Sequence, residues 1–458
     1  MTQDTHLQTV LFPGLADRDI LVIADEPTTS SDAGALLAHA AEKQLGFVDA
    51  FTEVIPDSRC KAMVNHPMDE LLRQRMIGLA CGYEDANDAA RLRGDPVHSM
   101  IVSGDPDREA ALASQPTLSR LENAIDSGTN LMLAMRFMKC ILLRQQQRLH
   151  GRARRIMIDF DSTDDPTHGG QQLSLFNTYY GTWCYQTLLG FVRFNDEKQQ
   201  HLVSATLLPG TGSMVAPAIV LLPLIVALLR VFFPHARICV RMDAGFAAPE
   251  MLDTFDALDL DFVLAMAGNK RLAALSEPYM IRARSLTERH RRTSRVYADA
   301  MYQAKTWRRA HRIIIKAEVV ALQDRDNRDN ARYVITNLPQ SARTVYREVY
   351  AKRGDVENRI KELKYDMAID RTSCSRYEAN CFRVTMTAAA YAILQEMHRA
   401  ARGTTLKNAQ VKNLRLSVIK VAGRVVASAR RIVVHLPETF AYLTEWLIIA
   451  RRLGATDG

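Results

Sequence analysis

The sequence predicts an α/β protein in which helices precede a central sheet. Apolar residues recur at helical spacing over 31–45 and 68–81 near the N-terminus. Residues 155–161 alternate instead, as a half-buried strand does, and this alternation places Asp159 and Asp161 on the same face. Further strand-like and helix-like segments follow in turn along the chain, which favours a sheet covered by helices.

Length and charge suggest several domains and an anionic partner. A chain of 458 residues corresponds to two or three domains at roughly 150 residues each. Its composition, 47% hydrophobic and 24% charged, is that of a globular protein. The first 150 residues carry a net charge of −7 and the remainder +15, so a phosphate-facing surface is expected in the later two-thirds. A basic surface that binds no ligand is an equally good interpretation of charge alone.

The order of the predicted elements divides the chain into three parts. Residues 1–150 form a mostly helical N-terminal domain, which includes a long helix over 131–149. Within 151–400 come three strands, an apolar helix, a strand, a helix and a strand, which is the order of a ribonuclease-H-like α/β core. A basic, β-rich insertion is expected at about 273–343. Residues 401–458 form a basic C-terminal tail or subdomain.

Three further features bear on the cellular compartment. The apolar run 214–229 is shorter than the ~20 residues that span a bilayer and contains two prolines, so a helix buried against the sheet is expected instead. The seven cysteines form no C-x-x-C pair, which indicates free thiols in a reducing cytoplasm. The first residues lack the pattern of a signal peptide. The expected location is therefore cytoplasmic, without a membrane.

Residues 350–364 carry the sharpest chemical signal. Tyr350, Arg353, Glu357 and Lys364 lie at offsets of 0, 3, 7 and 14, and at about 100° per residue they share one stripe of a helix. A carboxylate between two cations suits a metal ligand that faces a phosphodiester. The alternative is an ordinary amphipathic helix with exposed salt bridges.

Two aspartates join this glutamate. Asp161 and Asp243 each end an apolar strand, and carboxylates at strand ends point into the crevice where α/β sheets bind ligands. A single such aspartate is more often a helix cap or turn former. Two of them together with Glu357 indicate a site.

The chain resembles the DDE-type transposases of bacterial insertion sequences. The spacing Tyr-(2)-Arg-(3)-Glu-(6)-Lys at 350–364 is similar to the signature of their cut-and-paste branch. Several segments resemble the insertion-sequence thirteen-eighty group in particular: 158–169, 240–246 and 370–374, with 82–88 and 115–123 in the N-terminal part. The resemblance covers most of the chain and is weakest beyond about Arg402.

The resemblance implies the roles of the site residues. Asp161, Asp243 and Glu357 would be catalytic and would hold two Mg²⁺ ions, for which Mn²⁺ can substitute; such ions sit roughly 3.5–4 Å apart. Tyr350, Arg353 and Lys364 would contact DNA. Asp161 is preferred as the first ligand because it begins an Asp-Ser-Thr turn similar to that of the family, but Asp159 remains an alternative.

The implied function is cut-and-paste transposition. The protein would cleave double-stranded DNA at terminal inverted repeats and transfer the strands into target DNA, with the N-terminal domain binding ends or dimerising. A homodimer in the synaptic complex and association with the nucleoid follow from the family. A nuclease without strand transfer and a silent DNA-binding regulator are the alternatives. Trp307 is considered as a platform that stacks on an extruded base.

Overall fold

A nine-stranded mixed sheet lies at the centre of the computed structural model, which describes residues 9–108, 111–210, 212–322 and 325–457. Five neighbouring strands form its middle, in the order β7-β6-β4-β8-β9. β4, β8 and β9 are parallel, and β6 and β7 are antiparallel to their neighbours. These strands are β4 (Arg155–Pro166), β6 (Thr182–Phe194), β7 (His201–Pro209), β8 (Arg237–Met242) and β9 (Asp261–Met266), with the short β5 (Leu175–Asn177) beside β6.

Two helices connect the parallel strands. α8 (Val215–Phe232) links β7 to β8, and α9 (Pro249–Ala257) links β8 to β9. α8 buries Leu222 and Leu229 but leaves Val220 68% and Val231 70% exposed, so one side of this helix is buried and its outer face is open to solvent. Among the described helices, α8 alone is long and apolar enough to cross a membrane. Buried core helices of globular proteins meet the same two criteria, so this feature by itself does not indicate a membrane span.

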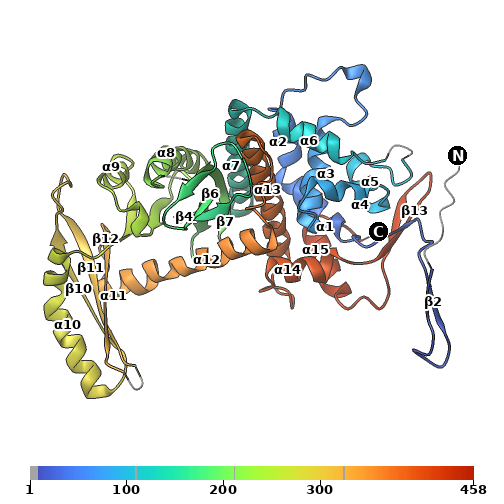
Figure 1. Ribbon diagram of the computed structural model, residues 1–458. Coiled ribbons are helices and arrows are strands. Elements are labelled where there is room, and N and C mark those ends of the chain that lie inside the picture. Colours follow the sequence, from blue (N-terminus) through green and yellow to red (C-terminus); the bar gives the residue numbers. More distant parts are fainter. Residues whose placement is uncertain (1–8, 109–110, 211, 323–324, 458) are drawn as a thin grey trace.

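The insertion widens the sheet beyond β9. β12 (Arg328–Thr336) pairs antiparallel with β9, and β11 (His311–Val320) and β10 (Ser294–Tyr302) follow outward. α10 (Lys270–His290) packs across β10 and β11. Three arginines of this basic insertion, Arg282, Arg284 and Arg289, lie on α10, at the outer end of the molecule in Figure 1.

A continuous helical segment crosses from the insertion toward the other end of the molecule (Figure 1). It comprises α11 (Ala342–Thr344), a π-helical turn (Val345–Tyr350), a 3₁₀ turn (Ala351–Arg353), α12 (Gly354–Lys361) and a second π-helical turn (Glu362–Asp366). π-turns change the angle between successive side chains, so the single stripe drawn at 100° per residue does not hold along the whole segment.

α13 (Tyr377–Ala400) joins the sheet to the N-terminal helices. It is buried along most of its length and packs against β7 on one side and the N-terminal helices on the other. Those helices are α1 (Ala35–Leu45), α2 (Phe47–Thr52), α3 (Met68–Cys81), α4 (Ala89–Leu92), α5 (Pro96–Ser103), α6 (Gln115–Ala124) and α7 (Ser127–Leu149), with 3₁₀ turns at Lys61–Met63 and Ala86–Asp88. The N-terminal part and the sheet thus share one core.

The C-terminal segment returns to the N-terminal helices. It contains α14 (Val411–Leu414), a π-turn (Arg415–Ile419), β13 (Gly423–Ala427), β14 (Ile432–His435) and α15 (Leu443–Arg452). β13 pairs with β3 (Thr29–Ser30), and α15 packs against α1 and α13. β1 (Thr9–Phe12) and β2 (Ile20–Ile23) form a separate hairpin.

Gly34 lies at a tight backbone contact between the N-terminal and C-terminal parts of the chain. Its N–H donates to the Ile419 carbonyl, and a Cβ atom at this position would lie 1.7 Å from the Val418 oxygen. The backbone of Val418 and Ile419 can pack this closely against the start of α1 only because residue 34 has no side chain.

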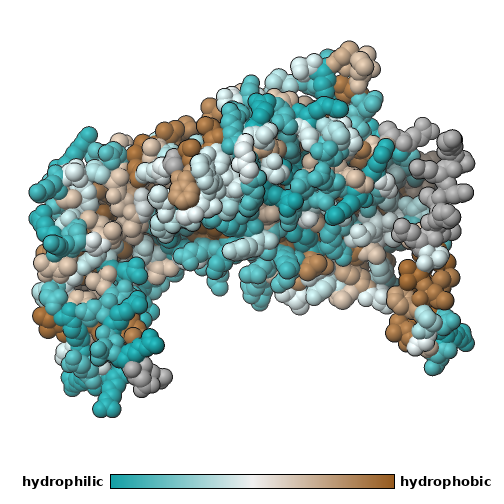
Figure 2. Space-filling view, viewed as in Figure 1, coloured by the Kyte–Doolittle hydropathy of each residue, from teal (hydrophilic) through white to brown (hydrophobic). Residues whose placement is uncertain are grey.

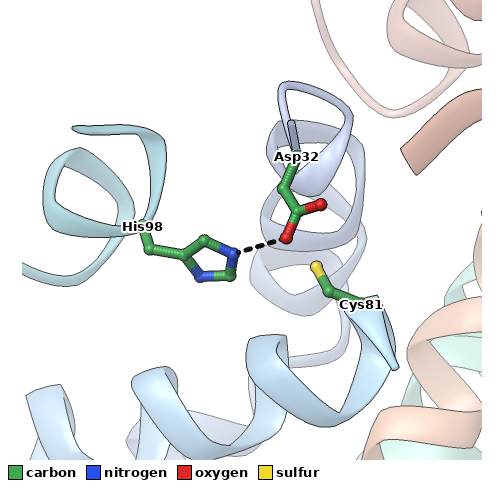
Figure 3. A group of neighbouring side chains, drawn as sticks. All are labelled: Asp32, Cys81 and His98. Carbon is green, nitrogen blue, oxygen red and sulfur yellow. Dashed lines mark hydrogen bonds and ion pairs between the residues drawn. The ribbon is translucent and has the colours of Figure 1, made fainter. Parts of the chain in front are cut away.

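A buried charge cluster lies beside this contact (Figure 3). Asp32 accepts hydrogen bonds from His98 Nε2 at 3.1 Å and Lys420 Nζ at 2.9 Å, and Cys81 lies next to both Asp32 and His98. Burial favours neutral groups, but the partners outweigh it: the pKa of Asp32 is lowered and that of His98 is raised to about 10. The three residues Asp32, Cys81 and His98 have metal-ligating atoms, yet Lys420 already supplies the opposite charge, which favours an ion-pair network over a metal site.

Candidate active site

Two neighbouring parallel strands bring Asp161 and Asp243 to the same edge of the sheet. The last register pair of β4 and β8 is Asp159 with Arg241, and the two aspartates lie two residues further along each strand. Asp243 then caps a 3₁₀ turn, with Oδ1 accepting the N–H of Gly245 at 2.9 Å. The side chain of Asp161 is 13% exposed and that of Asp243 39% exposed. Both carboxylates thus reach solvent at the edge of the sheet where β8 ends. Asp243 follows its strand as expected, but Asp161 does not end β4, because that strand continues to Pro166 in its pairing with β6.

Arg353 connects the two aspartates. Its Nη2 lies 2.7 Å from Asp161 Oδ2 and 3.5 Å from Asp243 Oδ2. Its Nε is buried and has no hydrogen-bond partner among the described residues. The guanidinium therefore contacts two carboxylates at once, while its Nε–H donates no hydrogen bond to any described residue.

Glu357 lies one helical turn beyond Arg353 and is exposed. The negative charges of the site affect one another through the pKa of Asp161, which is raised to about 6. Burial is the main cause, Arg353 opposes it, and Asp243 and Glu357 add to the rise by repulsion. The three carboxylates consequently share one electrostatic environment.

The three carboxylates do not form a closed ligand set. In the described part of the chain, only Asp32, Cys81 and His98 bring three potential ligand atoms within 4.8 Å of one another. Asp161 and Asp243 converge on Arg353, whereas Glu357 forms no ion pair with this arginine in the described part of the chain. Side-chain rotation and displacement of Arg353 are needed before all three can bind one cation.

Asp159 occupies a different environment from Asp161. It is 1% exposed, and its two oxygens accept hydrogen bonds from Arg241 Nε at 2.6 Å and Nη2 at 2.8 Å, and from Gln200. Arg241 also donates from Nη1 to the Val349 carbonyl, which fastens the helical segment to the sheet. The sequence analysis missed this role, although a charged residue inside the apolar strand 238–242 was a signal for a buried partner.

Tyr350 and Lys364 have partners of their own. The ring of Tyr350 packs against Tyr346 at 5.4 Å between centroids, and both line a cavity of about 590 Å³ that also includes Asp243 and Arg332. Lys364 Nζ lies 2.6 Å from Asp164 Oδ1 and is only partly exposed. The lysine, which lies within the second π-turn, thus pairs with a carboxylate near the far end of β4.

Two further residues, Asp165 and Trp307, have buried side chains. Asp165, completely buried, accepts a hydrogen bond from Thr372 Oγ1 at 2.8 Å, and burial raises its pKa to about 8. This bond ties the segment after the glutamate helix to β4. Trp307 is only 9% exposed and packs edge-on against Tyr302 and His311, so it presents little ring surface on which a base could stack.

A family model described as "Transposase DDE domain group 1" matches residues 12–456, nearly the whole chain. No curated protein matches this sequence.

Proposed function

This chain belongs to the transposase DDE domain group 1 family, and on that premise we propose that Asp161, Asp243 and Glu357 form the catalytic site of a cut-and-paste DNA transposase. One observation carries the assignment. Asp161 from within β4 and Asp243 directly after β8 both converge on Arg353, and Arg353 comes from the helical segment that also carries Glu357. Because Asp159 is already paired with Arg241, Asp161 is the better first ligand.

The residues of the site fit divalent ions. DDE transposases are generally metal-dependent, and carboxylate oxygens are the ligands that Mg²⁺ and Mn²⁺ prefer. The mutual repulsion that helps raise the pKa of Asp161 is relieved when cations bind between the carboxylates. We assign two Mg²⁺ ions to this site, replaceable by Mn²⁺. When bound, such a pair stabilises the attacking and leaving oxygens of an in-line displacement at phosphorus.

The protein groups around the carboxylates hold the DNA. Arg353 exchanges its carboxylate partners for a phosphate beside the scissile bond, and Lys364 binds a phosphate further along the strand. Tyr350 packs beside them at the mouth of the cavity. The first cut frees a 3′-hydroxyl, which then attacks a second phosphodiester, so the chemistry needs no covalent link to the protein.

We also propose a fold class for the sheet and a role for each domain. The order β7-β6-β4-β8-β9, with two antiparallel strands beside three parallel ones, supports a ribonuclease-H-like core within 151–400. The strands at 294–336 support the insertion at about 273–343. We assign DNA-end binding or dimerisation to 1–150, together with the C-terminal segment 401–458 that packs on it.

The test maps every product on a DNA fragment that contains the gene's own flanks. The purified protein is incubated with this DNA and Mg²⁺, with a chelator in a parallel sample, and breaks and joints are sequenced. Paired cuts at inverted repeats, with joined products that the chelator removes, are expected. Scattered cuts without joints would indicate a nuclease, and binding without breaks would indicate a silent regulator.

A further inference from the structure

The hairpin β1–β2, which we call the N-terminal arm (residues 9–23), exposes an unusual amount of apolar surface. Seven of its eight strand residues are apolar: Val10, Leu11, Phe12, Ile20, Leu21, Val22 and Ile23, each between 41% and 55% exposed. The register pairs Val10 with Val22 and Leu11 with Leu21, so apolar side chains lie on both faces. In Figure 2 the arm is the brown projection at the lower right, with a hydrophilic tip.

Such an arm is not stable by itself in water. A lone two-stranded hairpin is marginal at best, and natural proteins do not leave apolar strands with two open edges uncovered. Among the described strands, β1 and β2 pair only with each other. The arm therefore fits a surface that this copy of the chain does not provide.

A complementary surface lies on the C-terminal hairpin β13–β14. β14 is at the end of the sheet β14-β13-β3, so one of its edges is open among the described strands. Val426 and Ile432 expose 42% and 37% of their surface. The two hairpins thus each offer open strand edges and apolar side chains, which is the combination used when one strand is added to another sheet.

The charges of the two surfaces are opposite. Residues 9–26 contain four acidic residues and one arginine, a net charge of −3, and Asp17 and Asp19 lie in the exposed turn of the arm. Residues 423–435 contain three arginines and no acidic residue, a net charge of +3, and Arg430 and Arg431 lie in the exposed β13–β14 turn. Opposite charges at the two turns select one pairing and orientation.

We propose that the N-terminal arm docks on the β13–β14 hairpin of a second copy of this chain, and that the contact is reciprocal. Within one copy, the arm precedes β3, which pairs with one side of β13, whereas β14 and its open edge lie on the other side of β13. The arm of the same copy therefore lies on the wrong side of this sheet to cover the open edge of β14. A two-fold partner brings its own arm to the open edge, and the same contact then forms twice. The acidic tip disfavours DNA as the occupant because phosphates repel it.

This inference deepens the proposed function, since a transposase must hold two DNA ends together, but the contact itself needs no DNA. The test measures the monomer–dimer equilibrium of the full-length protein by sedimentation velocity without DNA. The wild type is expected to dimerise. The Asp17→Arg/Asp19→Arg and Arg430→Asp/Arg431→Asp proteins are each expected to dimerise at least about tenfold more weakly, because like charges then face each other.

Combining the four substitutions restores opposite charges and is expected to recover most of the affinity, which a folding defect would not allow. The Asp105→Arg/Asp107→Arg protein is the matched control, since these aspartates have the same spacing in another exposed loop, and it should dimerise like the wild type. A monomeric wild type, or a quadruple variant as weak as its parents, would overturn the proposal. Cleavage by the wild type on a single-end DNA reports separately on the proposed function.

Discussion

Under the proposed assignment, Arg353 and divalent cations compete for the same two carboxylates. The guanidinium of Arg353 lies between Asp161 and Asp243, where it offsets part of their repulsion. A metal ion bound there would have to move the arginine, and the displaced side chain would then be available for a DNA phosphate. We therefore propose that this one residue couples metal binding to DNA binding.

Replacing Arg353 with Gln should separate these two effects. We expect tighter Mg²⁺ binding, measured by isothermal titration calorimetry, because the competing cation is gone. DNA binding should weaken, and the slope of log K against log salt should fall by about one phosphate contact. Arg347→Gln, an exposed arginine on the same helical segment, is the control for Mg²⁺ binding. Equal Mg²⁺ affinity in both variants would show that Arg353 does not compete with the metal.

His98 should make stability depend on pH. Its folded pKa of about 10 lies above the ordinary 6.5, so its ion pair with Asp32 stabilises the fold fully below about pH 6.5 and is lost as pH rises toward 10. The difference in free energy of unfolding between the wild type and His98→Gln should therefore shrink over this interval in urea titrations. The exposed His235→Gln protein should show no such trend. A difference that stays constant with pH would contradict a charged His98.

At the scale of elements, the strands were predictable, whereas the end of β4 and the helix register were not. Alternation located the start of β4, and its parallel pairing with β8 placed Asp161 beside Asp243, although β4 continues to Pro166. The spacing that placed Lys364 in one stripe with Glu357 assumed a regular helix, but Lys364 lies within a π-turn and pairs with Asp164. Local sequence does not report where a helix changes its winding, because that depends on the surfaces packed against it.

The contact between Gly34 and the Val418–Ile419 backbone should be sensitive to a single methyl group. Gly34→Ala places Cβ against the Val418 carbonyl, and overpacking of this kind costs about 1–3 kcal/mol of unfolding free energy. Gly78→Ala is the matched control, because a Cβ there meets nothing within 4 Å and alanine favours its helix. Chemical denaturation of both proteins should show a loss for the first and none for the second. Equal stability of the two variants would contradict the close approach.

At the scale of the whole molecule, parts far apart in the sequence complete one core. α13 follows the glutamate helix yet packs against α1, α3, α6 and α7, and β13 pairs with β3. The predicted boundary near residue 150 came from a change of local pattern. Such a pattern cannot reveal which distant helix will cover an apolar face, so the packing of α13 and the C-terminal segment against the N-terminal helices was not predictable.

The fragment 1–150 is expected not to fold by itself. Without α13 and the C-terminal segment, its helices lose the surfaces that bury them. Thermal unfolding followed by circular dichroism should show no cooperative transition for the fragment, whereas adding the fragment 377–458 should restore one. A cooperative transition of the isolated fragment would show that it is an independent domain.

The central claim is that Glu357 belongs to a metal-binding catalytic set with Asp161 and Asp243. The most direct test compares Glu357→Gln with Glu348→Gln, an exposed glutamate on the same helical segment that pairs with Lys352. With Mg²⁺ and end-containing DNA, we expect the first variant to bind DNA but make no cuts, and the second to cut like the wild type. Cleavage by Glu357→Gln at the wild-type rate would contradict the account.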